Sequence, residues 1–177
     1  MKSFSNVRLR ALEPEDLDII YRIENEPAFW QFGTTTVPYS RYVLRQYLST
    51  TQNDLFKDEQ VRLVIEVQDS HGQWQSAGLA DLCNFSPMHL RAEVGIVVLP
   101  EFQQQGVGTQ ALSALEDYAR RLHLHQLYAI VAQTNRPAIR LFERLDFQSS
   151  ACLHDWLQQD TRFTDAILYQ KLLPVKM

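Results

Sequence analysis

The sequence predicts a mixed α/β fold in a single domain, and three observations lead to that prediction. The chain has 177 residues, which fits one domain spanning 1–177, and 45% of them are hydrophobic, which is ample for one core. Apolar side chains recur at spacings typical of strands in some segments and of helices in others. The order of these segments is a strand, two helices, three strands, a helix, a strand, a helix and two strands, which favours a mixed sheet over a doubly wound one.

One strand and two helices are expected at the start of the chain. Residues 7–11 alternate apolar and basic side chains, which is typical of a strand with one solvent-exposed face. Proline and acidic residues at 13–16 mark a helix start, because proline suits the first helical turn. Ser40 is the expected cap of a second helix over residues 39–48.

The loop between these helices, residues 28–38, contains the aromatic residues Phe29, Trp30 and Phe32. Aromatic side chains in a loop either cap the core or line a ligand cleft. Exposed aromatic area is costly unless it is used, so we favour the cap.

Three strands in succession are expected next. Residues 62–68 and 74–83 flank the turn residues 70–73, which predicts a hairpin. After a loop over 84–90, residues 91–99 form an apolar run rich in β-branched side chains, as in a strand that is buried on both faces.

The segment that follows this strand predicts a phosphate cradle. Gly106 and Gly108 permit a tight turn whose amides are not shielded by side chains, and residues 107–122 then show the apolar spacing of a helix. The first amides of a helix lack intrahelical partners and lie at the positive end of its dipole, so they attract anions. A purely structural turn would explain the two glycines equally well.

Two other phosphate-binding motifs fit less well. With Ala111, the glycines match the loose dinucleotide pattern G-x-G-x-x-A, but the next strand, residues 126–132, contains no acidic residue. A P-loop needs a Lys-Ser or Lys-Thr pair after its glycines, and the sequence has neither there.

The last third of the chain predicts a helix and two strands. Thr134 or Asn135 is the expected helix cap, Pro137 suits the first turn, and the helix stops at Asp146. Residues 147–153 and 164–172 are the expected closing strands, with a polar linker over 154–160.

Composition argues against several classes of protein. A net charge of -4 and a pI of about 5.7 give no support for nucleic-acid binding, and a cationic small molecule suits the chain better. We expect no metal, because Cys83 and Cys152 have no paired spacing and no third ligand lies near His123 and His125 in the sequence. We expect no membrane span and a cytoplasmic location, because no apolar run reaches the required length and residues 1–6 do not resemble a leader.

Two ordered motifs resemble the GNAT superfamily of acetyl-CoA-dependent N-acetyltransferases. The first motif follows the central strand and opens the long helix. It is matched by Pro100, Phe102, Gln103, Gly106 and Gly108. The second motif is matched by Asn135, Ala138 and Phe147. Residues 7–17 and 91–93 further resemble the branch that holds the spermidine acetyltransferases and the ribosomal-protein N-terminal acetyltransferases.

The resemblance implies a mostly antiparallel sheet of about seven strands, with a splay between the central strands and about four helices. It also implies the cofactor contacts. The pyrophosphate of acetyl-CoA would bind backbone amides of Gln103, Gln104, Gln105, Gly106, Val107, Gly108 and Thr109. The pantetheine arm would pair with the backbone of Val97, Val98 and Leu99, and Asn135 and Ala138 would line the other side of the thioester. Relatives often have a cation where this chain has Gln105.

Amine acetylation also needs a base and a fate for the leaving thiolate. An alkyl ammonium has a pKa near 10.4, so it must lose a proton before it attacks. Glu93 is the predicted base, although an ion pair with Arg91 or Arg62 would explain it as well. Family members commonly supply an acid from a tyrosine where this chain has Phe142, which we keep as a cofactor-site residue without a catalytic role. Tyr128 and Tyr169 could replace that tyrosine, but we favour core packing for both.

The prediction is therefore an acetyltransferase that moves an acetyl group from acetyl-CoA to a primary amine by direct attack in a ternary complex. The acceptor would be a polyamine, another small amine or a protein N-terminus. Glu24 and Glu26 could attract a cationic acceptor, although a solvated helix end explains them equally well. The alternative is a catalytically silent acyl-CoA-binding module, because Phe142 has no proton to give. The apolar closing strand could pair two copies as a homodimer.

Overall fold

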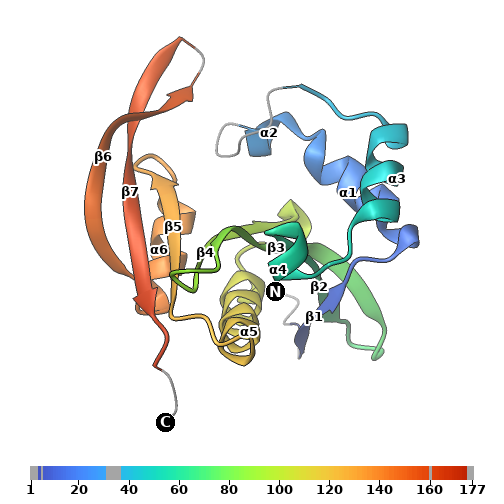
Figure 1. Ribbon diagram of the computed structural model, residues 1–177. Coiled ribbons are helices and arrows are strands. Elements are labelled where there is room, and N and C mark those ends of the chain that lie inside the picture. Colours follow the sequence, from blue (N-terminus) through green and yellow to red (C-terminus); the bar gives the residue numbers. More distant parts are fainter. Residues whose placement is uncertain (1–3, 5, 31–36, 160, 175–177) are drawn as a thin grey trace.

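The computed structural model describes residues 4, 6–30, 37–159 and 161–174. In this part of the chain seven strands form one sheet in the order β1-β2-β3-β4-β5-β7-β6 (Figure 1). Neighbouring strands are antiparallel except for β4 and β5, which are parallel. The predicted mixed and mostly antiparallel sheet is confirmed.

The strands range in length from five residues in β1 to 13 residues in β3. Their bounds are β1 (Val7–Ala11), β2 (Val61–Gln68), β3 (Trp74–Ser86), β4 (Arg91–Val98), β5 (Gln126–Ala132), β6 (Gln148–Gln159) and β7 (Arg162–Leu172). Helices connect them. These are α1 (Leu17–Glu24), α2 (Pro27–Trp30), α3 (Arg41–Thr50), α4 (Leu55–Asp58), α5 (Val107–Arg121) and α6 (Arg136–Arg144), with 3₁₀ turns η1 (Pro14–Asp16) and η2 (Pro100–Phe102). Of these, α1, α3, α5 and α6 are the four predicted helices, and the hydroxyl of Ser40 caps α3 as expected.

The structure corrects the sequence analysis in three segments. The expected loop at 28–38 begins with the short helix α2, and α4 is a further single turn. In the expected linker, residues 154–159 are instead strand, because β6 runs on to Gln159 and pairs with β7 beyond a bulge. Polar side chains on an exposed edge strand resemble a loop in sequence, which explains this error. Phe32 and residues 33–36, named above, lie outside the described residues.

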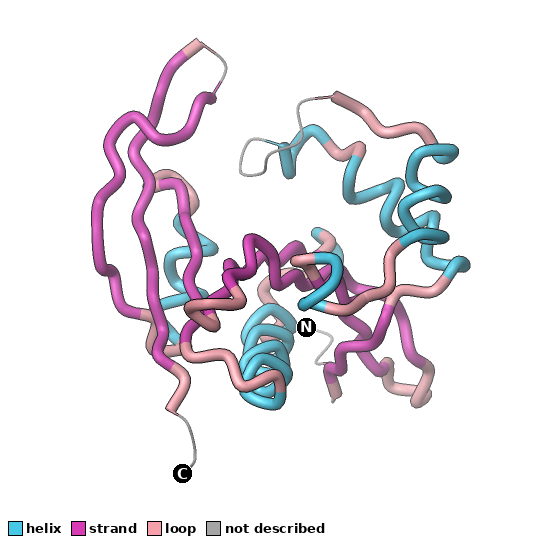
Figure 2. Tube along the Cα trace, in the orientation of Figure 1, coloured by secondary structure: helices cyan, strands magenta, loops and turns pink. Residues whose placement is uncertain are grey.

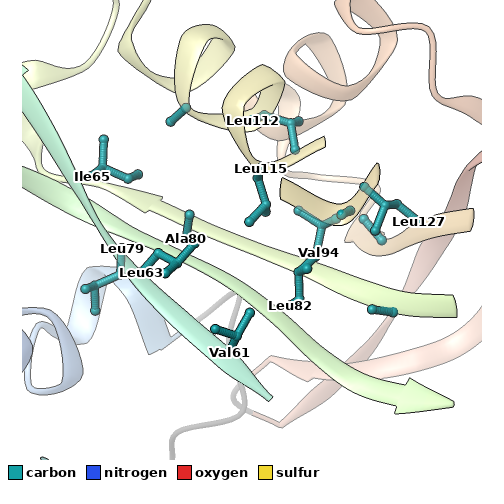
Figure 3. Packing of buried hydrophobic residues seen from close by; sticks show 14 of the residues in the cluster. Val61, Leu63, Ile65, Leu79, Ala80, Leu82, Val94, Leu112, Leu115 and Leu127 are labelled. Atoms are coloured by element: carbon teal, nitrogen blue, oxygen red, sulfur yellow. The ribbon is translucent and has the colours of Figure 1, made fainter. Parts of the chain in front are cut away.

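The main core lies between the central strands and α5. Figure 3 shows Leu112 and Leu115 of α5 directed at Leu82, Val94 and Leu127 of the sheet, and each of these side chains is buried. The other face of the sheet is covered by α1 and α3, which lie across the central strands from α5 (Figure 2). The chain thus forms three layers, helix, sheet and helix. Within the described residues no helix combines the length and the apolar character that crossing a bilayer requires.

The sheet opens between its two central strands. Within the described residues, β4 and β5 form three residue pairs, of which the last joins Glu93 to Tyr128. Beyond this point β4 stays paired with β3 as far as Val98, and β5 stays paired with β7 as far as Ala132. The two strands therefore diverge while each remains held on its outer side. This is the predicted splay.

Candidate acetyl-transfer site

The inner edge of β4 presents backbone groups to the splay. The Leu99 amide donates to the Ala77 carbonyl of β3 at 2.8 Å, and backbone direction alternates along a strand. Val97 therefore also faces β3. A Cβ at Gly78 would lie 2.0 Å from the Val97 carbonyl oxygen, so only glycine fits there. Of the three residues predicted to pair with pantetheine, only Val98 directs its backbone groups at the splay, and the prediction is wrong for Val97 and Leu99. By the same alternation the backbone of Ile96, which was not predicted, also faces the splay.

The turn after β4 leaves the start of α5 uncapped. Gln104 and Gly106 both have left-handed backbone angles, with φ of 57° and 80°. Gly106 is the N-cap residue, and it makes no side-chain cap because it has no side chain. The amides of Val107, Gly108 and Thr109 thus begin a 15-residue helix at its positive end. This local geometry is the anion-binding arrangement that the two glycines predicted.

Glutamine side chains brace the same turn from within. The side-chain amide of Gln103 donates to the Val98 carbonyl at 2.7 Å, and the side-chain amide of Gln105 donates to the Glu101 carbonyl at 2.9 Å. Glu101 in turn makes a two-pronged ion pair with Arg22 of α1, at 2.6 and 3.0 Å. The Gln105 side chain therefore supports the turn through its amide donor. The Arg22 pair ties the turn to the helical layer on the other side of the sheet.

The N-terminus of α6 lies beside this turn. The Asn135 side-chain oxygen accepts a hydrogen bond from the Ala138 amide at 3.2 Å, which confirms the predicted cap. Leu141, one turn further on, comes within 3.7 Å of the position that a Cβ on Gly108 would take. The structure therefore brings the helix starts of both sequence motifs to the same end of the splay.

Phe142 is a buried core residue, as are Leu99 and Val107 among the predicted site residues. It is 3% exposed and packs against Phe147 edge to face and against Tyr169 in a stack. Tyr169 is buried, and its hydroxyl donates to Glu143 at 3.2 Å. Burial, and then the hydrogen bond to Glu143, raise the pKa of Tyr169. Core packing, which the sequence analysis favoured for both Tyr169 and Tyr128, is confirmed for Tyr169 and wrong for Tyr128, which is partly exposed.

Glu93 stands at the point where the splay begins, with three polar neighbours. Asn84, which a bulge in β3 turns toward β4, donates to its carboxylate at 2.7 Å. Tyr128 lies opposite it on β5, and burial followed by the Glu93 charge raises the pKa of that phenol. Cys83 lies opposite it on β3, where burial, and then Glu93 and Asp81, raise the pKa of the thiol to about 12. The site thus holds one carboxylate, an amide that orients it and two groups that stay protonated.

A largely buried ionic cluster adjoins Glu93 on the same face of the sheet. Arg62 on β2 bonds to Asp81 on β3 at 2.8 Å and to Glu24 on α1 at 2.7 Å, and these three side chains are only 15 to 19% exposed. Burial raises the pKa of Asp81 against the opposing attraction of Arg62. Although burial disfavours the Arg62 cation, the two carboxylates raise its pKa.

Two alternatives from the sequence analysis are wrong at this cluster. Arg62 does not serve as the ion-pair partner of Glu93, because strand register sets it opposite Asp81. Glu24 is not a solvated helix end, because its carboxylate is enclosed beside Arg62. Asn84 and Asp81 had not been selected from the sequence. Only strand register and a bulge bring them to the site, and no local motif marks either.

These groups line one partly exposed surface, which we call the splay face and define as Glu93, Gly95, Val97, Tyr128 and Ile130. Each is neither fully buried nor fully exposed, whereas Val94 and Leu127, one residue away, are buried against α5. Backbone donors, a bare helix start and an oriented carboxylate therefore meet along one gap in the sheet. The arrangement could hold an extended ligand with an anionic end and could take a proton near its other end.

Comparison with known proteins shows the family of the chain. Residues 6–148 match the acetyltransferase (GNAT) domain family. The chain is 32% identical over 148 residues to spermidine N(1)-acetyltransferase of Escherichia coli K12, covering 83% of this chain and 75% of the relative.

Solved structures agree. Spermidine N-acetyltransferase from Vibrio cholerae, in complex with CoA and spermine, superposes with a TM-score of 0.81 at 27% identity, covering 95% of this chain and 96% of that one. Another structure of the Vibrio enzyme, with a TM-score of 0.75, is described as dodecameric. RimL, a ribosomal L7/L12 alpha-N-protein acetyltransferase in complex with coenzyme A, shares the fold with a TM-score of 0.80 at 18% identity and 97% coverage of both chains. The chain belongs to the GNAT family and is an acetyltransferase.

Proposed function

We propose that this acetyltransferase moves the acetyl group of acetyl-CoA to a primary amine of a polyamine, by direct attack in a ternary complex. The observation that carries the proposal is the splay, which joins an uncapped helix start to an oriented carboxylate. The relatives named as spermidine acetyltransferases support the choice of a polyamine over a protein N-terminus.

Acetyl-CoA would lie along the gap between β4 and β5. Its pyrophosphate would accept hydrogen bonds from the amides of Val107, Gly108 and Thr109, where the dipole of α5 adds attraction. Its pantetheine amides would pair with the inner edge of β4 at Val98 and Ile96, as an added strand does. The Gln103 side chain now bonds the Val98 carbonyl and would give way to the ligand. Asn135 and Ala138 would border the other side.

Glu93 would take the proton of the incoming ammonium, directly or through a water molecule. An alkyl ammonium with a pKa near 10.4 is almost wholly protonated at neutral pH, so a base at the attack point raises the reactive fraction. Asn84 holds the carboxylate in place with its 2.7 Å hydrogen bond. The ionic cluster would attract the acceptor, because it pairs two carboxylates, Glu24 and Asp81, with the single cation of Arg62.

The acetyl group would pass straight to the amine without resting on a cysteine. Cys83 is the cysteine next to Glu93, and a thiol with a pKa of about 12 forms almost no thiolate at neutral pH. The departing CoA sulfur would leave as a thiolate and take a proton afterwards, since a thiol pKa near 8.5 makes it a tolerable leaving group. Phe142 has no proton to offer, and the Tyr169 hydroxyl is engaged with Glu143.

The proposal is tested with purified protein, acetyl-CoA and a panel of amines, with free thiol followed over time. With spermidine or spermine, acetyl-CoA should release its free thiol. Mass spectrometry should show that each amine gains one acetyl group. Peptides with free N-termini should react far more slowly. CoA binding without turnover on any amine would contradict the proposal and support the silent CoA-binding module instead.

We also propose that the protein self-associates through the hairpin of β6 and β7. Trp156 and Phe163, near the tip of this hairpin, are each more than half exposed, and exposed apolar area of this kind marks association surfaces. The Vibrio relative described as dodecameric is consistent with assembly. Light scattering on the purified chain should give a mass above that of one copy, and a monomer at all concentrations would contradict this.

A further inference from the structure

Three side chains of metal-binding type converge on the β6–β7 hairpin. Cys152 and His154 lie on β6, and Asp165 lies on β7. The His154 Nδ1 atom is 3.1 Å from Asp165 Oδ2, and the Cys152 sulfur is 3.7 Å from that oxygen and 3.9 Å from the same nitrogen. The three donor atoms therefore face one point.

A bulge in the hairpin creates this convergence. Leu153 pairs with Ala166 and Leu157 pairs with Thr164, so Asp165 alone stands opposite the residues between Leu153 and Leu157. Cys152 and His154 are two apart on the strand and so project to the same face. Sequence alone gives little sign of the site, because a bulge is set by strand pairing and not by a local motif.

Neighbouring groups already orient two of the three side chains. The Asp155 amide donates to Asp165 Oδ1 at 3.0 Å, which leaves Oδ2 directed at His154 and Cys152. The side-chain amide of Gln133, just beyond β5, donates to the Cys152 sulfur at 3.3 Å. Such outer partners fix ligand geometry in metal sites.

The distances suit a tetrahedral zinc ion. Zinc binds sulfur at 2.3 Å and nitrogen or oxygen at 2.0 to 2.2 Å, which sets ligand atoms about 3.3 Å apart for nitrogen and oxygen and about 3.5 Å apart when sulfur is one of them. The three separations measured in the protein lie within about 0.4 Å of these values. A Cys-His-Asp catalytic triad is a worse fit, because it would use both ring nitrogens, whereas here Nδ1 faces both partners.

We propose that Cys152, His154 and Asp165 bind one Zn²⁺ per chain, with water in the fourth position. Bonds form from the thiolate sulfur, from Nδ1 of neutral His154 and from Asp165 Oδ2, and the thiol proton is released to solvent. Thiolate, imidazole and carboxylate together favour zinc over magnesium or calcium, which prefer oxygen ligands alone. The ion would clamp β6 to β7 at the bulge and stiffen the hairpin that carries Trp156 and Phe163.

The test is a titration of the tag-free, CoA-free full chain with Zn²⁺ in a non-chelating buffer against a chromogenic chelator. CoA is left out because its own thiol binds zinc. Wild type should bind one equivalent. Cys152→Ser and His154→Ala should each lose tenfold or more in affinity, because replacing even an outer partner of a metal ligand typically costs about 10- to 100-fold. The matched controls Cys83→Ser and His125→Ala, which change a cysteine and an exposed histidine outside the cluster, should bind like wild type.

Cobalt gives a second readout that does not depend on activity. Co²⁺ bound by a thiolate should produce a sulfur-to-metal charge-transfer band in wild type and in Cys83→Ser, and the band should be missing in Cys152→Ser. His154 is 80% exposed, so His154→Ala should keep the fold intact. It therefore tests the site through zinc affinity even if Cys152→Ser fails to fold. Absence of the band in wild type, its persistence in Cys152→Ser, or equal zinc affinity in all variants would overturn the proposal.

Discussion

The two faces of the central sheet are built from the same strands but differ in nearly every property. On the α5 face, Leu82 and Val94 are buried in an apolar layer. One residue away, on the splay face or beside it, stand Asp81 and Glu93, which are ionisable and partly exposed. Because successive side chains on a strand point to opposite faces, β3 and β4 can supply stability on one side and chemistry on the other. The difference predicts how substitutions on each face should change the stability and the activity of the protein.

The largest effect is expected from Arg62→Ala. The change leaves the enclosed carboxylates of Glu24 and Asp81 without their cation, and breaking a buried ion pair in this way costs about 3 to 5 kcal/mol. The free energy of unfolding should be measured by urea denaturation. Arg22→Ala is the control, since its pair with Glu101 is about half exposed and should contribute about 1 kcal/mol or less.

This loss should depend on pH. Burial already raises the pKa of Asp81 above its ordinary value of 3.8, and loss of Arg62 should raise it further. A carboxyl whose folded pKa is raised favours the folded state fully below its unfolded pKa, and this contribution is lost as the pH rises through the folded pKa. The deficit of Arg62→Ala should therefore shrink as the pH falls from about 8 toward about 5. A deficit that stays constant would contradict the assignment of this face as electrostatic.

On the α5 face, Leu115→Ala should cost about 2 to 5 kcal/mol through lost burial and a cavity. No titratable group is involved, so urea denaturation should give the same loss at both pH values. Met88→Ala, at a side chain that is 86% exposed, should change the free energy of unfolding by about 0.5 kcal/mol or less. A loss at Leu115 that followed pH like that at Arg62 would erase the distinction between the faces.

Glu93→Gln should impair chemistry and spare stability. Loss of a general base typically costs about 10²-fold or more in rate, whereas glutamine keeps the shape of the side chain. Steady-state kinetics should show a fall in kcat/KM, with the melting temperature and CoA affinity near those of wild type. Glu143→Gln, away from Glu93 and beside Tyr169, is the matched control. A fully active Glu93→Gln enzyme would remove Glu93 from the mechanism.

Gly108→Ala should give the smallest effect and the most specific one. A methyl group there fits, because its nearest neighbours would be 3.7 Å away or more, and alanine favours helix by about 0.5 to 1 kcal/mol over glycine. Calorimetry should find the protein at least as stable and CoA affinity reduced about tenfold, the equivalent of one charge-assisted hydrogen bond. Ser113→Ala, exposed on the same helix, should leave CoA affinity unchanged.

Much of the cofactor half of the site could be predicted from sequence because its determinants are local. Gly106 ends the turn with a left-handed backbone, and Asn135 caps α6 three residues before Ala138, and both are fixed by neighbours in the chain. The short helices α2 and α4 were missed because four residues carry little periodic signal.

The polar half of the site depends on contacts between distant segments. Arg62, Asp81 and Glu24 come from β2, β3 and α1, and the bulge that brings Asn84 to Glu93 is visible only once β3 is paired with β4. The Cys152, His154 and Asp165 cluster arises in the same way, at a bulge in a segment that the sequence suggested was a linker. Register and bulges are properties of strand pairing, so no single segment encodes them.

Amide hydrogen exchange with and without CoA tests the central claim most directly, because the claim is that backbone groups of the splay hold the cofactor. We expect CoA to slow exchange at Ile96 and Val98 on the inner edge of β4, and at Val107, Gly108 and Thr109 at the start of α5, while Val97 and Leu99, which face β3, change little. Protection that is absent from these amides, or that appears on the hairpin of β6 and β7 instead, would contradict the account.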